Sequence, residues 1–293
     1  MHRRGDEIVV CGTFVHTGAP VVLWTDPGGY DAYRVQPRFK PTDLEKPIDA
    51  IGARYGPIRK NLPPETLARV ERNGWTLGDL RDNVDLFVLH YDVCAVSRRC
   101  FQVLQDERGL SVHFMLDVDG TIYQTLDVKE RAWHAGPAND RSIGVEIANI
   151  GAYADAAALD RWYRRDDEGK PTLTLPESWG HGGVRTHGFV ARPALAEPIC
   201  GPINGKPYCQ YDLTPEQYDS LIRLTAALCR TLPGIRPEFP RDARGTVLTR
   251  TMSAEELARF HGVLGHFHLT DLKIDPGPAF DWERLQRGLS VAP

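Results

Sequence analysis

The chain has 293 residues, of which 42% are hydrophobic and 25% are charged, and its formal net charge is −4. This balance is typical of a globular protein with a buried core, and the length suits one large domain or two small ones. The weakly acidic charge excludes a basic surface for nucleic acid, and no apolar run approaches the length that crosses a bilayer.

Residues 1–80 are predicted to form an N-terminal extension, a small β-rich segment followed by a helix. Apolar runs at 8–10 and 21–24 indicate short strands around turn residues, and a helix with proline at its start is expected over 65–72. His16 is interpreted as a surface or packing residue. The apolar run 8–11 is too short for a signal peptide, which favours a cytoplasmic protein unless a leader has been removed.

Residues 81–293 are predicted to form the main domain. Strands are expected at 86–90, 111–117, 121–126, 142–149 and 263–269, and helices at 98–108, 154–165, 214–232, 253–260 and 279–287. This alternation predicts an α/β (α+β) fold with a central mixed β-sheet flanked by helices. Residues 166–212, rich in Gly and Pro, are predicted to be a long insertion with a function of its own or a mobile lid.

The six cysteines do not determine whether the protein is in an oxidising or a reducing compartment. Cys94 and Cys100 flank a short loop, and Cys200 and Cys209 bracket a turn, so each spacing would suit a small disulfide loop. Cys11 and Cys229 remain as buried thiols or a third pair. Paired cysteines would favour a periplasmic or secreted protein, whereas six reduced cysteines would fit the cytoplasm.

The strongest chemical signal is the stretch 265–277, which gathers His266, His268, Asp271, Lys273 and Asp275 before a Pro-Gly turn. Hydrolytic zinc sites combine His nitrogen and Asp oxygen as three ligands and leave one position for water. Two ligands in this stretch would leave one to find elsewhere in the chain.

His90, at the end of an apolar strand, is the leading candidate for the third ligand. Glu146 lies in the middle of another apolar strand, where a carboxylate is costly to bury without a partner or a task. One interpretation is that Glu146 forms an ion pair with Arg141. Because three candidate metal ligands are also present, the better interpretation is that Glu146 acts as a general base.

Six blocks of sequence, in order from about residue 81 to 288, resemble the zinc N-acetylmuramoyl-L-alanine amidases, a superfamily that includes peptidoglycan recognition proteins. The blocks are Phe87–His90, Ser111–Phe114, Asp119–Gln124, Arg131–Gly136, Ser142–Ile147 and Gly265–Trp282. The resemblance implies one Zn²⁺ ion held by His90, His266 and Asp275. Asp275 together with Lys273 resembles the muropeptide-recycling branch, and Glu146 matches its acidic base.

The resemblance also implies a reaction. A bound zinc ion lowers the pKa of its water from about 16 toward about 7, and Glu146 would pass a proton from that water to the departing L-alanine nitrogen. Lys273, with His134 as a further donor, would stabilise the oxyanion. The expected substrate-binding rim consists of His134, Trp133, Arg131, Asn139 and Arg141, although Trp133 would equally suit the core.

Two alternatives remain for the metal ligands. His268 stands where relatives commonly have Asp, and on a strand it would share a face with His266, so that it would displace or supplement a ligand. His181 and His187 would offer a second metal site, although their Gly-rich surroundings favour ordinary loop residues.

The expected function is therefore hydrolysis of the amide bond between the lactyl group of N-acetylmuramic acid and L-alanine, with peptidoglycan or muropeptide fragments as partners. A non-catalytic peptidoglycan receptor and a zinc amide hydrolase with another substrate are the rivals. The sequence leaves the oligomeric state, the stem-peptide preference and the choice of intact wall or soluble muropeptide open.

Overall fold

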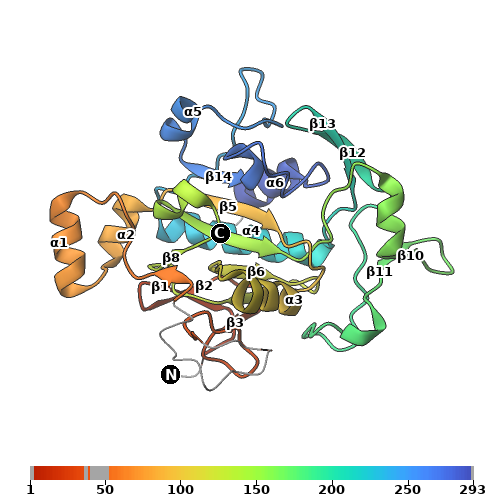
Figure 1. The fold of residues 1–293 in the computed structure, drawn as a ribbon, viewed down its shortest axis with the longest axis horizontal. Coiled ribbons are helices and arrows are strands. Elements are labelled where there is room, and N and C mark those ends of the chain that lie inside the picture. Colours follow the sequence, from red (N-terminus) through yellow and green to blue (C-terminus); the bar gives the residue numbers. More distant parts are fainter. Residues whose placement is uncertain (1–2, 36–38, 40–52, 292–293) are drawn as a thin grey trace.

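The computed structural model describes residues 3–35, 39 and 53–291 of the chain (Figure 1). The rest of the predicted N-terminal extension and the last two residues lie outside this described part. One central sheet organises the structure. Helices cover both of its faces, smaller elements surround it, and the predicted α/β class with a mixed sheet is confirmed.

The central sheet has six strands in the order β14-β5-β9-β6-β7-β3. All neighbours run parallel except β6 and β7, which form the predicted hairpin. The strands are β3 (Val21–Leu23), β5 (Leu86–Tyr91), β6 (Phe114–Leu116), β7 (Ile122–Gln124), β9 (Ser142–Ile147) and β14 (Gly262–Gly265). The inner strands β5 and β9 are almost entirely buried, as expected for parallel strands covered on both faces.

Helices α4 (Pro215–Thr231) and α6 (Trp282–Val291) pack on one face, and α3 (Ser97–Gln102) packs on the other. In Figure 1, α4 lies behind the strands and α3 in front of them. The helix of α3 continues with wider, π-type turns over Val103–Arg108 and ends at Gly109, in the left-handed conformation. Side chains of β9 alternate: Ile143, Val145 and Ile147 join the core under α4, so Ser142, Gly144 and Glu146 face the other side.

The N-terminal segment contributes to the same core. Its strands are β1 (Glu7–Val10), β2 (Thr13–His16), β3 and β4 (Tyr55–Gly56), and its helices are α1 (Pro64–Asn73) and α2 (Leu77–Asn83). Strand β3 is the edge of the central sheet, and Ile8 and Val10 are completely buried in the cluster beneath α4. β4 pairs with β8 (Arg131–Ala132) of the main domain. The domain boundary near residue 80 stays a prediction.

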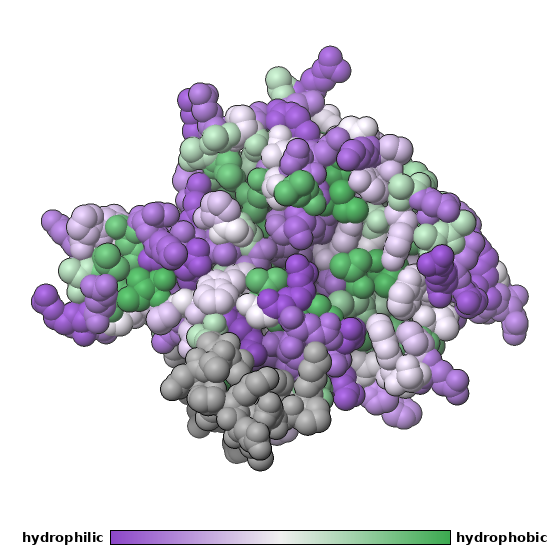
Figure 2. Space-filling model, in the orientation of Figure 1, coloured by the Kyte–Doolittle hydropathy of each residue, from purple (hydrophilic) through white to green (hydrophobic). Residues whose placement is uncertain are grey.

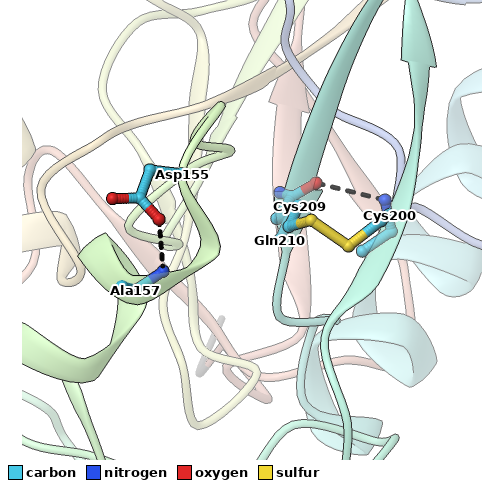
Figure 3. Close-up of a disulfide and its surroundings, with 6 residues drawn as sticks. Asp155, Ala157, Cys200, Cys209 and Gln210 are labelled. Carbon is cyan, nitrogen blue, oxygen red and sulfur yellow. Dashed lines mark hydrogen bonds between the residues drawn. A yellow bond between two sulfur atoms is a disulfide. The ribbon is translucent and has the colours of Figure 1, made fainter.

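Two hairpins lie at the two ends of the predicted insertion, on the side of the sheet opposite α1 and α2, and the first of them begins just before residue 166 (Figure 1). They are β10 (Tyr163–Arg165) with β11 (Pro171–Leu173), and β12 (Ile199–Ile203) with β13 (Lys206–Gln210). Cys200 and Cys209 face each other across the second hairpin and form a disulfide, with Gln210 beside it (Figure 3).

Three local predictions are wrong. Residues 154–165 form a short 3-10 turn, Ala156–Arg161, followed by β10, because β11 pairs with the chain there. The last strand stops at Gly265, and His266–His268 form a 3-10 turn, so the strand argument that put both histidines on one face does not hold. The small disulfide loop that the spacing of Cys94 and Cys100 would suit is not formed, because both residues are free thiols.

Hydrophilic side chains cover most of the face seen in Figure 2, and hydrophobic ones form several separate groups. Among the described residues, none of the helices combines the length and the apolar character that a transmembrane span requires.

Candidate active site

The ends of two neighbouring parallel strands and one turn bring three predicted ligands together. His90 lies near the end of β5, and His266 and Asp275 lie in the turns that follow β14, the adjacent strand. His90 Nδ1 is 3.0 Å from His266 Nδ1 and 2.9 Å from Asp275 Oδ2, and His266 Nδ1 is 3.0 Å from the same oxygen. All three side chains are buried. Three donor atoms so close together have the spacing of ligands around one small cation.

The electrostatics of this cluster suit a cation. Burial and the neighbouring His266 lower the pKa of His90 to about 4, so its ring is neutral at pH 7. Burial alone would raise the pKa of Asp275, but the hydrogen bonds with His266 and His90 outweigh it and hold that pKa below its ordinary value. Neutral imidazole and ionised carboxylate are the forms that bind a metal ion. The residues therefore fit the zinc ion that the sequence implies.

A cavity of about 310 Å³ opens in front of the cluster. Glu146, Lys273, His134 and Trp133 line it together with the three buried donors. Glu146 stands beside His90 in the register of β9 and β5. Burial, Asp275 and Asp92 raise the pKa of Glu146 well above its ordinary value. Within the described part of the chain, its carboxylate has no hydrogen-bond partner, so it is available to a ligand.

Three residues expected at the rim lie elsewhere. Arg131 forms an ion pair with Asp140, and Arg141 forms one with Asp85. Asn139 is buried and accepts hydrogen bonds from the backbone amides of His134 and Ala135, 3.1 and 2.7 Å away. None of the three lines the cavity, because each of these side chains stabilises the surrounding loops. The Arg141–Asp85 pair also removes the alternative in which Arg141 neutralises Glu146.

The other histidines considered as metal ligands, His268, His181 and His187, do not join the cluster. His268 Nδ1 accepts a hydrogen bond from Gly265 N, and its Nε2 donates to Leu248 O at 2.8 Å, so both ring nitrogens are used by the backbone. His181 and His187 line a separate cavity of the insertion. Among the described residues they belong to no group of metal-binding side chains; the other such group joins exposed His16 to Asp6 and Glu7.

His134 lines the cavity as expected, but it also contacts the proposed ligand His90. Its Nδ1 lies 3.0 Å from His90 Nε2 rather than pointing only into the cavity, and the ring stands over Gly144. One sequence pattern indicates this arrangement. Ser142, Gly144 and Glu146 are at alternate positions of a strand, so they lie on the same face. No local signal identifies Arg59, a fully buried residue behind the His134 loop.

A buried His–His–Asp cluster beside an open carboxylate, at the ends of parallel strands of an α/β sheet, defines a hydrolase with a metal-binding donor set. The sequence model of the N-acetylmuramoyl-L-alanine amidases matches residues 80–278, more than half of the chain. The chain belongs to this family of enzymes, whose members hydrolyse the bond between the lactyl group of N-acetylmuramic acid and L-alanine.

Solved structures give a weaker likeness. AmpD, as a selenomethionine derivative, is 18% identical over 71% of this chain and 86% of its own, with a TM-score of 0.36. Escherichia coli AmiD, in complex with an anhydromuramoyl tripeptide, is 19% identical over 70% of this chain and 57% of its own (TM-score 0.38). Pseudomonas aeruginosa AmpDh3, in complex with an anhydromuramic pentapeptide, is 19% identical over 70% and 60%, respectively (TM-score 0.39). No curated protein matches the chain. The family assignment rests on the family model.

Proposed function

We propose that the chain is a zinc-dependent N-acetylmuramoyl-L-alanine amidase in which His90, His266 and Asp275 hold the ion, Glu146 is the general base and Lys273 stabilises the oxyanion. The observation that carries the proposal is the convergence of these three donor atoms within about 3 Å of one another, on the wall of a cavity that also contains Glu146. A bound zinc ion would supply Lewis-acid polarisation and lower the pKa of the attacking water.

Glu146 is suited to move the proton. Burial and the nearby Asp275 raise its pKa well above that of an ordinary carboxyl group, which favours giving a proton to the leaving group. In this mechanism the carboxylate takes a proton from the water that attacks the lactyl carbonyl. It then delivers that proton to the amide nitrogen of L-alanine, so that the leaving group departs as a neutral amine.

Lys273 is suited to stabilise the negative charge that develops during the reaction. It is two residues from Asp275, is half-buried and lines the cavity. Its positive charge favours the negative oxygen that develops when the carbonyl becomes tetrahedral. Trp133, at the same cavity, is proposed to contact the sugar of the substrate. Muropeptides are the proposed substrate, because Asp275 and Lys273 together resemble the recycling branch of the family.

The test is product analysis with a matched active-site variant. Wild-type protein with zinc should convert a muramoyl tripeptide into free sugar and free peptide, measured by mass spectrometry, and a chelator should abolish this reaction. Glu146→Gln keeps the shape of the side chain but cannot accept the proton, so it should retain one zinc ion per chain while turnover falls by about 10² to 10⁴. Glu146→Gln with near wild-type turnover would remove Glu146 from the mechanism.

The same assay separates the rivals. A non-catalytic receptor would bind the muramoyl peptide without releasing products, and a hydrolase for another substrate would leave it intact. The Cys200–Cys209 disulfide favours the oxidising alternative for localisation, periplasmic or secreted. The intact mass of protein purified without reductant tests this, since the disulfide lowers the mass by two hydrogens.

A further inference from the structure

The ring of His134 lies directly behind the proposed ligand His90. His90 presents Nδ1 to His266 and Asp275, and its other nitrogen, Nε2, is 3.0 Å from His134 Nδ1. A histidine that binds metal through one nitrogen carries its proton on the other, and the group that accepts this proton fixes the orientation of the ring. His134 is in the position to do this for His90.

The surroundings of His134 leave its ring little freedom. A Cβ atom at Gly144 would lie 2.5 Å from His134 Nδ1, so the ring rests against the backbone of β9 and only glycine leaves it room. On its far edge, His134 Nε2 is 3.3 Å from the hydroxyl of buried Ser142. The ring is therefore held between His90 and Ser142.

The backbone that carries His134 depends on Asn139 and on a residue outside the family match. The Asn139 side chain accepts hydrogen bonds from the amides of His134 and Ala135. The Asn139 carbonyl accepts in turn from Arg59 Nη1 at 3.0 Å. Arg59 belongs to the N-terminal segment, before residue 80.

Arg59 is completely buried, and its guanidinium donates to four backbone carbonyls. Nη1 bonds those of Asn139 and Ser142 at 3.0 and 2.9 Å, and Nη2 bonds those of Val128 and Glu130 at 2.8 and 2.9 Å. A buried charge is costly unless its hydrogen bonds are made. These four carbonyls border the segment 128–142, so Arg59 ties together both ends of the segment that carries His134.

We propose that Arg59 is a positioning residue for the metal centre: it fixes segment 128–142 so that His134 holds His90 in its metal-binding orientation. This inference rests on the proposed function, because it requires His90 to be a zinc ligand. It also makes the N-terminal segment, which the family match does not include, a necessary part of the active site.

The experiment measures zinc affinity by competition with a chromophoric chelator, on variants shown by circular dichroism to be folded. Arg59→Met and His134→Ala should each weaken zinc binding about 10- to 100-fold, the range typical for outer partners of a ligand. The double variant should be no weaker than His134→Ala alone, because Arg59 acts through His134. Gly144→Ala should give a similar loss by displacing the ring.

The matched control is Arg54→Met. Arg54 is a buried arginine of the same segment, and its side chain also donates to three backbone carbonyls, those of Gln105, Arg34 and Val35, all outside segment 128–142. It should lose stability and keep its zinc affinity. Equal losses in Arg54→Met and Arg59→Met, or losses that multiply in the double variant, would overturn the inference.

If Arg59→Met does not fold, Arg59→Lys decides, since an ammonium group cannot reach both pairs of carbonyls and should weaken zinc binding several-fold. Wild-type zinc affinity in folded Arg59→Lys would then overturn the inference. The variant His90→Ala distinguishes a failure of this inference from a failure of the proposed function. If His90→Ala keeps zinc, the ligand set itself is wrong; if it loses zinc while the Arg59 variants keep it, only the role of Arg59 is wrong.

Discussion

The side-chain amide of Gln210 donates a hydrogen bond to the carbonyl oxygen of Pro276, 3.1 Å away. The backbone amide of Ala279 donates back to the Gln210 side-chain oxygen at 3.2 Å. Gln210 follows Cys209 on β13 and is almost completely buried. Because Pro276 follows Asp275 directly, the disulfide-bonded hairpin of the insertion holds the turn that carries a proposed metal ligand.

Gln210→Leu should therefore weaken both stability and zinc binding. It leaves the buried Pro276 carbonyl and Ala279 amide without their partner, which costs about 1–3 kcal/mol for each such group in the free energy of unfolding. Urea denaturation measures the first effect and chelator competition the second. Gln217→Leu is the control, since it removes similar buried bonds to Ala148 and Thr214, away from Asp275. Equal zinc affinity in the two variants would contradict this role of Gln210.

The variants Asp275→Ala and His268→Ala should differ in their zinc content. Asp275→Ala should lose zinc, because it removes the only carboxylate of the cluster. His268→Ala should keep one zinc ion per chain and lose stability, because the Leu248 carbonyl and the Gly265 amide lose their partner at about 1–3 kcal/mol for each group. Elemental analysis of the purified variants makes the comparison. Zinc lost from His268→Ala and kept by Asp275→Ala would reverse the assignment.

Lys273→Met should lower kcat by about 10² to 10³ while KM changes little, because the charge acts on an oxyanion that exists only near the transition state. Zinc content should not change, since Lys273 is not among the donors. Steady-state kinetics on a muramoyl tripeptide measures both constants. A large rise in KM with unchanged kcat would instead assign Lys273 to binding the ground state of the substrate.

Asp117 should make the stability of the protein depend on pH. Burial and the nearby Asp119 raise the pKa of this completely buried side chain to about 7. Between about pH 4 and 7, folded Asp117 keeps a proton that the unfolded chain has released, so stability falls as pH rises, by up to about 1.4 kcal/mol per pH unit.

Asp117→Asn does not titrate and should lose this contribution to the slope, while the other buried carboxyls keep theirs. Urea denaturation of both proteins at several pH values from 4 to 7.5 measures the difference. The variant should gain stability relative to wild type as pH rises through this window. Parallel curves for the two proteins would show that Asp117 titrates normally in the folded state.

Local chemistry in the sequence predicts much of the fold. Thr214 and Ser253 cap α4 and α5 (Ala254–Arg259) through capping boxes with Gln217 and Glu256, as their spacing indicates. The turn between β6 and β7 follows from its Asp-Gly pair. The helix expected over 154–165 is not formed, because a non-local contact decides this segment. Its partner strand β11 lies outside the sequence window that suggests a helix.

The sequence by itself determined the donor types, since His90, His266 and Asp275 carry their chemistry wherever the chain places them, and the strand that ends near His90 is local. Only the tertiary structure decided which other polar residues reach the site. Arg141 pairs with Asp85, Asn139 binds the loop backbone and Arg59 reaches segment 128–142 from about 70 to 80 positions away in the sequence. Such contacts depend on which buried polar groups remain unpaired once the sheet has formed, and no spacing along the chain encodes that.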